Sequence, residues 1–143
     1  MRQSTMDKVV SMGARSRDAV AVDPEIIRTE FERVQARAPG VTLMLLSTAD
    51  GRSVADWTHA QLDPRRVAAM TNTFLTLGET LAKELGMDSA DHATVSTGQG
   101  SMVVIRIQGA RPYTLAVSGA RDATLAVLLF AARECAARIR ALL

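Results

Sequence analysis

Aromatic residues and cysteine are scarce in this sequence of 143 residues. Phe, Trp and Tyr together make up 3% of the chain, which is little material for the stacked aromatic surfaces that bind single-stranded nucleic acid. The single cysteine, Cys135, excludes an internal disulfide, and one cysteine with two histidines is too few for an ordinary zinc site. We therefore expect no metal, no cofactor, no nucleic-acid partner and a reducing, cytoplasmic location.

Long apolar runs and a dominant charge are also lacking. The longest apolar run without a charge, Ala123 to Ala132, is about half of the roughly 20 residues that span a bilayer. The stretch from Met1 to Val22 has no apolar core of the length that a signal peptide needs. The net charge is only +2, and cations alternate with acids, as at Glu32 and Arg33. The sequence therefore predicts a soluble protein without membrane insertion.

The remaining composition is that of one compact domain. Hydrophobic residues make up 48% of the chain and charged residues 22%, with 9 Gly and 4 Pro. Residues 1–22 show no periodic apolar pattern, so we interpret them as a mobile N-terminal arm that is dispensable for folding. The folded domain is expected to cover residues 23–143.

Two segments open with an aspartate followed by a proline, which is a typical helix start. Asp23-Pro24 and Asp63-Pro64 each place a capping carboxylate before a residue whose fixed φ suits the first helical position. The first helix is predicted to end before Pro39-Gly40. The second is predicted to run to Gly86, because glycine suits the left-handed conformation that ends helices. A third helix is predicted from Asp122 onward.

The last helix is apolar on two sides. Its main stripe, at three- and four-residue spacing, comprises Leu125, Leu128, Leu129, Ala132, Ala136, Ile139 and Leu143. Val127, Phe130 and Ala131 lie behind this stripe and predict side-by-side contact with the first helix. Cys135 lies at the border of the stripe, where a small buried apolar residue is far more common than a nucleophile.

Five short segments have strand patterns bounded by turn signals: 41–48, 53–57, 92–97, 101–108 and 113–118. The first is apolar on both sides, as in a strand covered on both faces. Asp50-Gly51 indicates a hairpin turn between the first two strands. The third is rich in Thr and Ser, like an edge strand. The order α-β-β-α-β-β-β-α with an antiparallel sheet predicts the α+β class.

The second helix carries two stripes, which we interpret differently. The larger side chains are expected to lie on the sheet: Val67, Met70, Phe74, Leu77, Leu81 and Leu85. The second stripe is mostly small and is expected to meet a second copy of the helix: Ala68, Thr71, Leu75, Gly78 and Ala82. Thr94, Val95 and Ser96 of the edge strand would continue this homodimer surface. The alternative is that loops or the N-terminal arm cover the second stripe within one chain.

No strong catalytic motif is present. Gly98-Gln99-Gly100 begins like a dinucleotide-binding loop, but Val103 replaces the third glycine and a strand follows, so a turn is the better interpretation. The P-loop, H-E-x-x-H and G-x-S-x-G patterns do not occur. His59 and His92 are expected at the surface. The sequence therefore predicts a protein that is not an enzyme.

Several segments follow one another in a characteristic order and spacing: Ala49-Asp50-Gly51-Arg52-Ser53-Val54-Ala55, Leu62-Asp63 before Val67-Ala68-Ala69-Met70, Leu77-Gly78-Glu79, and Glu84-Leu85-Gly86. With the later strands and the long last helix, residues 24–143 resemble the roadblock/dynein light chain family. The resemblance implies a five-stranded antiparallel sheet with the second helix on one face and the first and third helices on the other. It also implies a homodimer joined through the second helix and the third strand.

The resemblance further implies a function. Family members are mostly not enzymes but dimeric platforms that bind small Ras-like GTPases. In bacteria and archaea these platforms activate GTP hydrolysis by the GTPase or regulate motility and polarity. Arg65, Asn72 and Glu79, expected to be exposed beside the dimer seam, are candidate contacts for such a GTPase. Two alternatives stay open: a structural adaptor of the light-chain type without GTPase regulation, and a small-ligand sensor with a pocket between sheet and helix.

Overall fold

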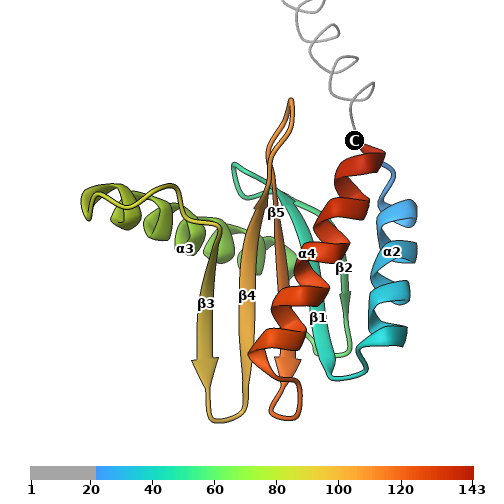
Figure 1. Cartoon of the computed structure of the whole chain (residues 1–143). Coiled ribbons are helices and arrows are strands. Elements are labelled where there is room, and N and C mark those ends of the chain that lie inside the picture. Colours follow the sequence, from blue (N-terminus) through green and yellow to red (C-terminus); the bar gives the residue numbers. More distant parts are fainter. Residues whose placement is uncertain (1–21) are drawn as a thin grey trace, which may run out of the picture.

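The computed structural model describes residues 22–143, and within them the helices and strands follow the predicted order (Figure 1). The elements are α2 (Pro24–Arg37), β1 (Val41–Thr48), β2 (Ser53–Thr58), α3 (Pro64–Glu84), β3 (His92–Thr97), β4 (Gly100–Ile107), β5 (Tyr113–Ala120) and α4 (Leu125–Leu142). The N-terminal arm predicted for residues 1–22 lies outside the described residues except for Val22, which packs against the core.

The five strands form one antiparallel sheet in the order β2-β1-β5-β4-β3. The predicted edge strand, β3, does lie at an edge, paired with β4. β1 lies between β2 and β5 and is buried over most of its length, as its two-sided apolar pattern predicts. The α+β class and the strand arrangement are therefore confirmed.

Side-chain caps set the starts of the helices. The Asp23 carboxylate accepts a hydrogen bond from the Glu25 backbone N–H at 3.0 Å, and the Asp63 carboxylate accepts one from the Arg65 N–H at 3.1 Å. The prediction that the last helix begins at Asp122 is three residues early, because the Thr124 hydroxyl caps α4.

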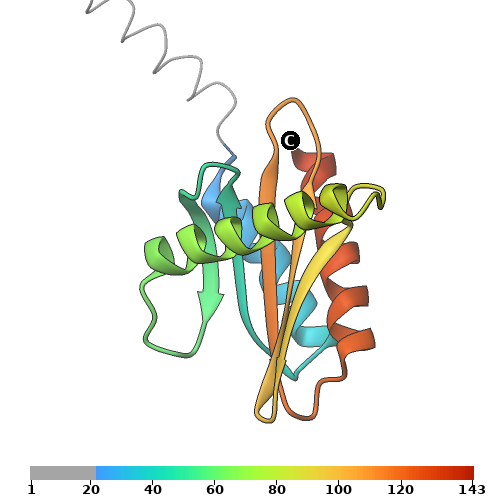
Figure 2. The same cartoon turned by 90° about the vertical axis from the view of Figure 1, so that its left-hand side faces the viewer.

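The helices cover the sheet from both sides. α2 and α4 lie next to each other on one face, and α3 crosses the other face (Figures 1 and 2). The larger core, on the α2 and α4 side, includes Phe31, Met44 and Ile139. The smaller core, beneath α3, includes Leu45 and Leu75. This arrangement confirms the predicted placement of the three helices.

The assignment of the two α3 stripes is wrong. Ala68, Thr71 and Leu75, predicted to face a second copy, are buried against the sheet, with Ala68 and Leu75 0% exposed. The larger residues predicted to lie on the sheet mostly point outward, and Leu77 is 66% exposed. The physical reason is close packing, because small side chains let α3 approach the strands. Where α3 passes β3, a Cβ added to Gly78 would lie 3.7 Å from the Ala93 Cβ.

Candidate interaction surface

The outward side of α3 is strongly apolar. Five large apolar side chains on it and just after it are between 56% and 66% exposed: Met70, Leu77, Leu81, Leu85 and Met87. Soluble monomers rarely expose contiguous apolar patches of this kind unless the patch binds something. We call these five residues the α3 stripe.

The C-terminal part of α3 extends beyond the sheet. The helix passes the edge strand β3 near Gly78 and continues to Glu84, so its last turns project past β3 (Figure 1). Within residues 22–143, β3 pairs with β4 alone, which leaves one side of its backbone without a strand partner. An unpaired strand edge beside an apolar helix end is a natural place for another chain to add.

An open groove lies on the same sheet face, beside the N-terminal half of α3. Its volume is about 880 Å³. The walls combine residues of α3, the strands and the β2–α3 loop, among them Leu43, Leu62, Met70, Phe74 and Met102. In Figure 2, α3 crosses the upper part of this face and leaves the lower part of the strands without a helix over it. One face of the sheet therefore presents both an apolar groove and, beyond β3, a projecting helix end with exposed apolar side chains.

A buried polar network fixes α3 to the sheet. Asn72 donates through Nδ2 to the Ser47 hydroxyl and the Ala68 carbonyl oxygen, both at 2.8 Å, and its Oδ1 accepts from the Thr114 hydroxyl at 2.6 Å. Arg106 on β4 donates through Nη1 to Thr114 at 2.5 Å and to Asn72 at 3.2 Å. Such a network specifies one position of the helix because its groups are satisfied only there.

Glu79 completes this network at the surface. Its Oε1 lies 2.7 Å from Nη2 of Arg106, whose side chain is only 10% exposed. Arg106 was not among the residues predicted from the sequence. A signal was present, because Arg106 follows Met102 and Val104 at the two-residue spacing of one strand face, and a charge there needs a partner.

The predicted site residues are only partly brought together. The expectation that Ala68, Thr71 and Leu75 form an exposed dimer surface is wrong, because they are core residues of the single chain. Asn72, predicted to be exposed to a partner, is 5% exposed and held within the network, so that expectation is also wrong. The preference of asparagine for surfaces misled the prediction, since its amide is fully paired inside.

The other predicted residues remain accessible to different degrees. Gly78 and Ala82 are half-buried, and Glu79 is half-buried beside Arg106. Arg65 is exposed in the first turn of α3. On β3, Thr94 is half-buried, Val95 is 44% exposed and Ser96 is exposed. Their role in an interface stays a prediction.

The described part of the chain contains little that resembles a catalytic centre. Within residues 22–143, no three His, Cys, Asp or Glu side chains gather as a metal site would require. Cys135 is 0% exposed, and burial, reinforced by nearby Glu30, raises the pKa of its thiol to about 12. His59 is exposed as expected, whereas His92 is half-buried. No helix among these residues is long and apolar enough to cross a membrane.

Comparison with solved structures finds the same fold in bacterial proteins. Myxococcus xanthus MglB is similar with a TM-score of 0.70 and 17% identity, over 80% of this chain and 85% of that chain. The gliding protein MglB from Thermus thermophilus gives 0.71 and 15%, over 83% and 89%. A Roadblock/LC7 domain from Streptomyces avermitilis gives 0.69 and 20%, over 77% and 91%. At these identities the likeness concerns the fold.

Sequence comparison gives the family. Among curated proteins, none matches this chain. The family model of the Roadblock/LC7 domain matches residues 30–129, from the middle of α2 into the first turns of α4. This range includes all five strands and the whole of α3. The chain therefore belongs to the roadblock/LC7 family, which is generally a non-catalytic adaptor fold.

Proposed function

We propose that this protein is a homodimeric, non-enzymatic platform that binds a small Ras-like GTPase in the cytoplasm. The observation that carries the dimer is the α3 stripe, whose C-terminal part projects past β3 while an apolar groove lies open on the same face. Membership of the roadblock/LC7 family supports the role as a regulatory module. The protein shares its fold with bacterial MglB proteins, and we therefore take a bacterial regulator as the model for its role.

The occupant proposed for the groove is the α3 end of a second copy. Around a two-fold axis beside β3, two edge strands come together and each projecting helix end passes over the partner's sheet. Leu81 and Leu85 then have an apolar surface to cover, namely the groove lined by Leu43, Phe74 and Met102. Val95, exposed on β3 and also lining the groove, lies at the junction. One contact thus covers the helix stripe, the groove and the strand edge.

The first experiment tests this dimer by sedimentation velocity. Leu81→Glu places a carboxylate in the proposed apolar contact, so we expect a shift from dimer to monomer at micromolar concentration. Leu125→Glu is the matched control, because Leu125 is 43% exposed on α4, on the other face of the sheet. The control should stay dimeric. A wild-type protein that is monomeric, or a Leu81→Glu protein that is as dimeric as the control, would contradict the proposal.

The proposed GTPase contact involves the surface made by the paired α3 helices. Arg65 and Glu79 remain candidates there, whereas Asn72 is withdrawn because it is buried. A partner that prefers the GTP state must touch the switch loops that the terminal phosphate orders. A tenfold preference corresponds to only about 1.4 kcal/mol, which one or two charged hydrogen bonds supply.

Calorimetry tests the GTPase contact. A Ras-like GTPase from the same organism is loaded with a GTP analogue or with GDP and titrated into the dimer, and GTP turnover is followed with and without the dimer. We expect tighter binding of the GTP form, and weaker binding by Arg65→Glu. Faster turnover would identify an activator, and binding without faster turnover a scaffold. No binding in either state by an intact dimer would leave the light-chain-type adaptor as the better account.

The small-ligand sensor has one observation in its favour. The groove of about 880 Å³ falls within the size range of small-molecule sites. In the dimer that we propose, the partner's helix occupies this space. Native mass spectrometry distinguishes the two, because a sensor would retain a bound molecule whereas the platform gives the mass of two unmodified chains.

A further inference from the structure

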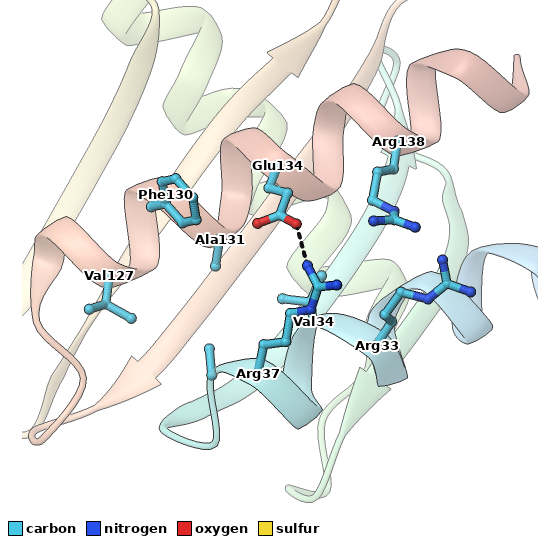
Figure 3. Close-up of a pocket in the computed structure, with 9 residues that line it drawn as sticks. Arg33, Val34, Arg37, Val127, Phe130, Ala131, Glu134 and Arg138 are labelled. Atoms are coloured by element: carbon cyan, nitrogen blue, oxygen red, sulfur yellow. Dashed lines mark hydrogen bonds and ion pairs between the residues drawn. The ribbon is translucent and has the colours of Figure 1, made fainter.

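A second groove lies on the opposite face of the sheet, between α2 and α4. Its volume is about 440 Å³, and its sides come from Arg33, Val34, Arg37 and Ala38 of the α2 side and from five residues of α4 (Figure 3). The two helices are antiparallel here, because Arg37 pairs with Glu134 whereas Arg138 pairs with Glu30. The groove is independent of the α3 stripe, since the sheet separates them.

One end of the groove is apolar and open. Phe130 is 71% exposed and Val127 46%, although both were predicted to contact the first helix. Only Ala131 of that predicted set is buried. The reason is that α2 ends at Arg37, beside Glu134, one turn before Phe130 is reached. The prediction is therefore wrong for Phe130 and Val127, and two apolar side chains are left without cover from α2.

The other end of the groove is cationic at its surface. The Arg37 guanidinium lies 2.7 Å from Glu134, and the Arg138 Nε lies 2.9 Å from Glu30. Glu30 also lies 3.6 Å from Arg33. The arginine side chains are more exposed than their partner: 47% for Arg33 and 37% for Arg138, against 13% for Glu30. Glu134 is less deeply buried, at 33% against 63% for Arg37. Three guanidiniums and two carboxylates thus leave a net positive charge at the surface of the groove.

We propose that this groove binds an acidic amphipathic helix of a partner protein. Exposed Phe130 and Val127 contact aliphatic side chains of the helix, and the guanidiniums of Arg33, Arg37 and Arg138 pair with its carboxylates. Each guanidinium has five N–H donors in a planar fork suited to carboxylates, so one contact to a glutamate of this chain leaves donors for the partner. From Val127 to Arg138 the groove follows about 16 Å of α4, the length of three helical turns.

The charge of the chain's own N-terminal segment does not fit this groove. Residues 1–21 contain four cations and two acids: Arg2, Lys8, Arg15, Arg17, Asp7 and Asp18. The groove itself is lined by three arginines and one glutamate. Like charges juxtaposed across an interface are unfavourable. Complementarity therefore favours an acidic segment supplied by another protein.

Fluorescence anisotropy tests the proposal on the full-length protein. The probes are fluorescein-labelled 14-residue helical peptides with leucines one turn apart at one end and four glutamates at the other, made in both sequence orders. We expect one order to bind in the micromolar range, and the same peptide with glutamines to bind at least tenfold more weakly. Binding should also weaken as salt rises, because exposed charges are screened.

Variants then assign the binding to the groove. The double variant Arg33→Glu, Arg37→Glu should weaken binding at least tenfold, and Phe130→Ala should weaken it as well. The double variant Arg52→Glu, Arg111→Glu makes the same charge change at two exposed positions outside the groove and should alter binding less than twofold. Circular dichroism and sedimentation confirm that each variant is folded and dimeric, so failure here is distinguishable from failure of the α3 dimer.

Three results would overturn the proposal. The first is no binding of any glutamate peptide at several hundred micromolar protein, and the second is equal binding by both double variants. The third is a more than tenfold gain in peptide affinity on removal of residues 1–21, which would assign the groove to the chain's own segment. If the groove arginines instead govern binding to phosphatidylserine vesicles and no peptide binds, the surface is a membrane contact and the proposal is wrong.

Discussion

Arg106 is the residue through which α3 and the sheet are most directly connected. Its guanidinium contacts Thr114 on β5 and both Asn72 and Glu79 on α3. Removing it leaves the Thr114 and Asn72 groups, which are 0% and 5% exposed, with fewer partners and no access to water. The network therefore contributes to stability mainly through what its loss would leave unpaired.

Arg106→Met should lower the free energy of unfolding by about 1–3 kcal/mol, because buried acceptors lose a charged donor. Urea denaturation followed by circular dichroism measures the change. Arg111→Met, in an exposed loop position, is the control and should change it by less than about 0.5 kcal/mol. Equal stability of the two variants would contradict the importance of the network.

Cys135 should be nearly inert in the folded protein. Its pKa is raised from an ordinary 9.0 to about 12, so at pH 8 about one thiol in 10,000 is ionised, against about one in ten for a free thiol. Reaction with a thiol reagent is thus expected to be more than a hundredfold slower than in denaturant. Rapid labelling of the native protein at pH 8 would show that α4 opens readily.

The same group gives a pH dependence of stability. The folded pKa is raised, so the stabilising effect is fully present below pH 9 and is lost as the pH rises from 9 toward 12. Cys135→Ala should be less sensitive to pH over this window in urea titrations. An identical decline for both proteins would assign the alkaline loss of stability to other groups.

At the scale of whole elements, α4 lies close to β5 because Gly119 has no side chain. A Cβ at this position would lie 2.6 Å from Leu128 Cδ2 and 2.9 Å from the Ala123 Cβ. Leu128 is itself 0% exposed, so it has little room to move away. The seating of the helix therefore depends on a missing side chain.

Gly119→Ala should lower the free energy of unfolding by about 1–3 kcal/mol through overpacking. Gly98→Ala is a matched control, because an added Cβ there would have nothing within 4 Å. Guanidinium denaturation of both variants measures the difference. A Gly119→Ala protein that is as stable as the Gly98→Ala protein would show that α4 adjusts without cost.

Sequence patterns predicted the elements far better than their exposed faces. Asp23-Pro24 and Asp63-Pro64 gave the starts of α2 and α3 because capping is local chemistry. Both sides of α3 are apolar, however, and periodicity alone cannot say which side a sheet will cover. The side of α3 with the smaller residues faces the sheet, because small side chains allow the helix to lie close to the strands. The network of Asn72 and Arg106 was missed for a related reason, since it joins elements that are distant in sequence.

For the whole molecule, residues 1–22 are predicted to be dispensable for folding, because they supply no periodic apolar face. A protein beginning at Asp23 should have a melting temperature within a few degrees of the full-length protein. Differential scanning calorimetry measures this. A larger loss would show that the domain boundary lies earlier, with Val22, which already packs on the core, as the first indication.

The sheet order also bears on how the chain is synthesised. β1 lies between β2 and β5, so one side of it is paired within a hairpin, while its other neighbour is the last strand to be made. Roughly 70 residues separate the ends of β1 and β5, and a ribosome needs about 4 to 14 s to add them. For that time a mainly apolar strand has one unpaired edge, and we therefore expect the nascent chain to bind holding chaperones until β5 is made.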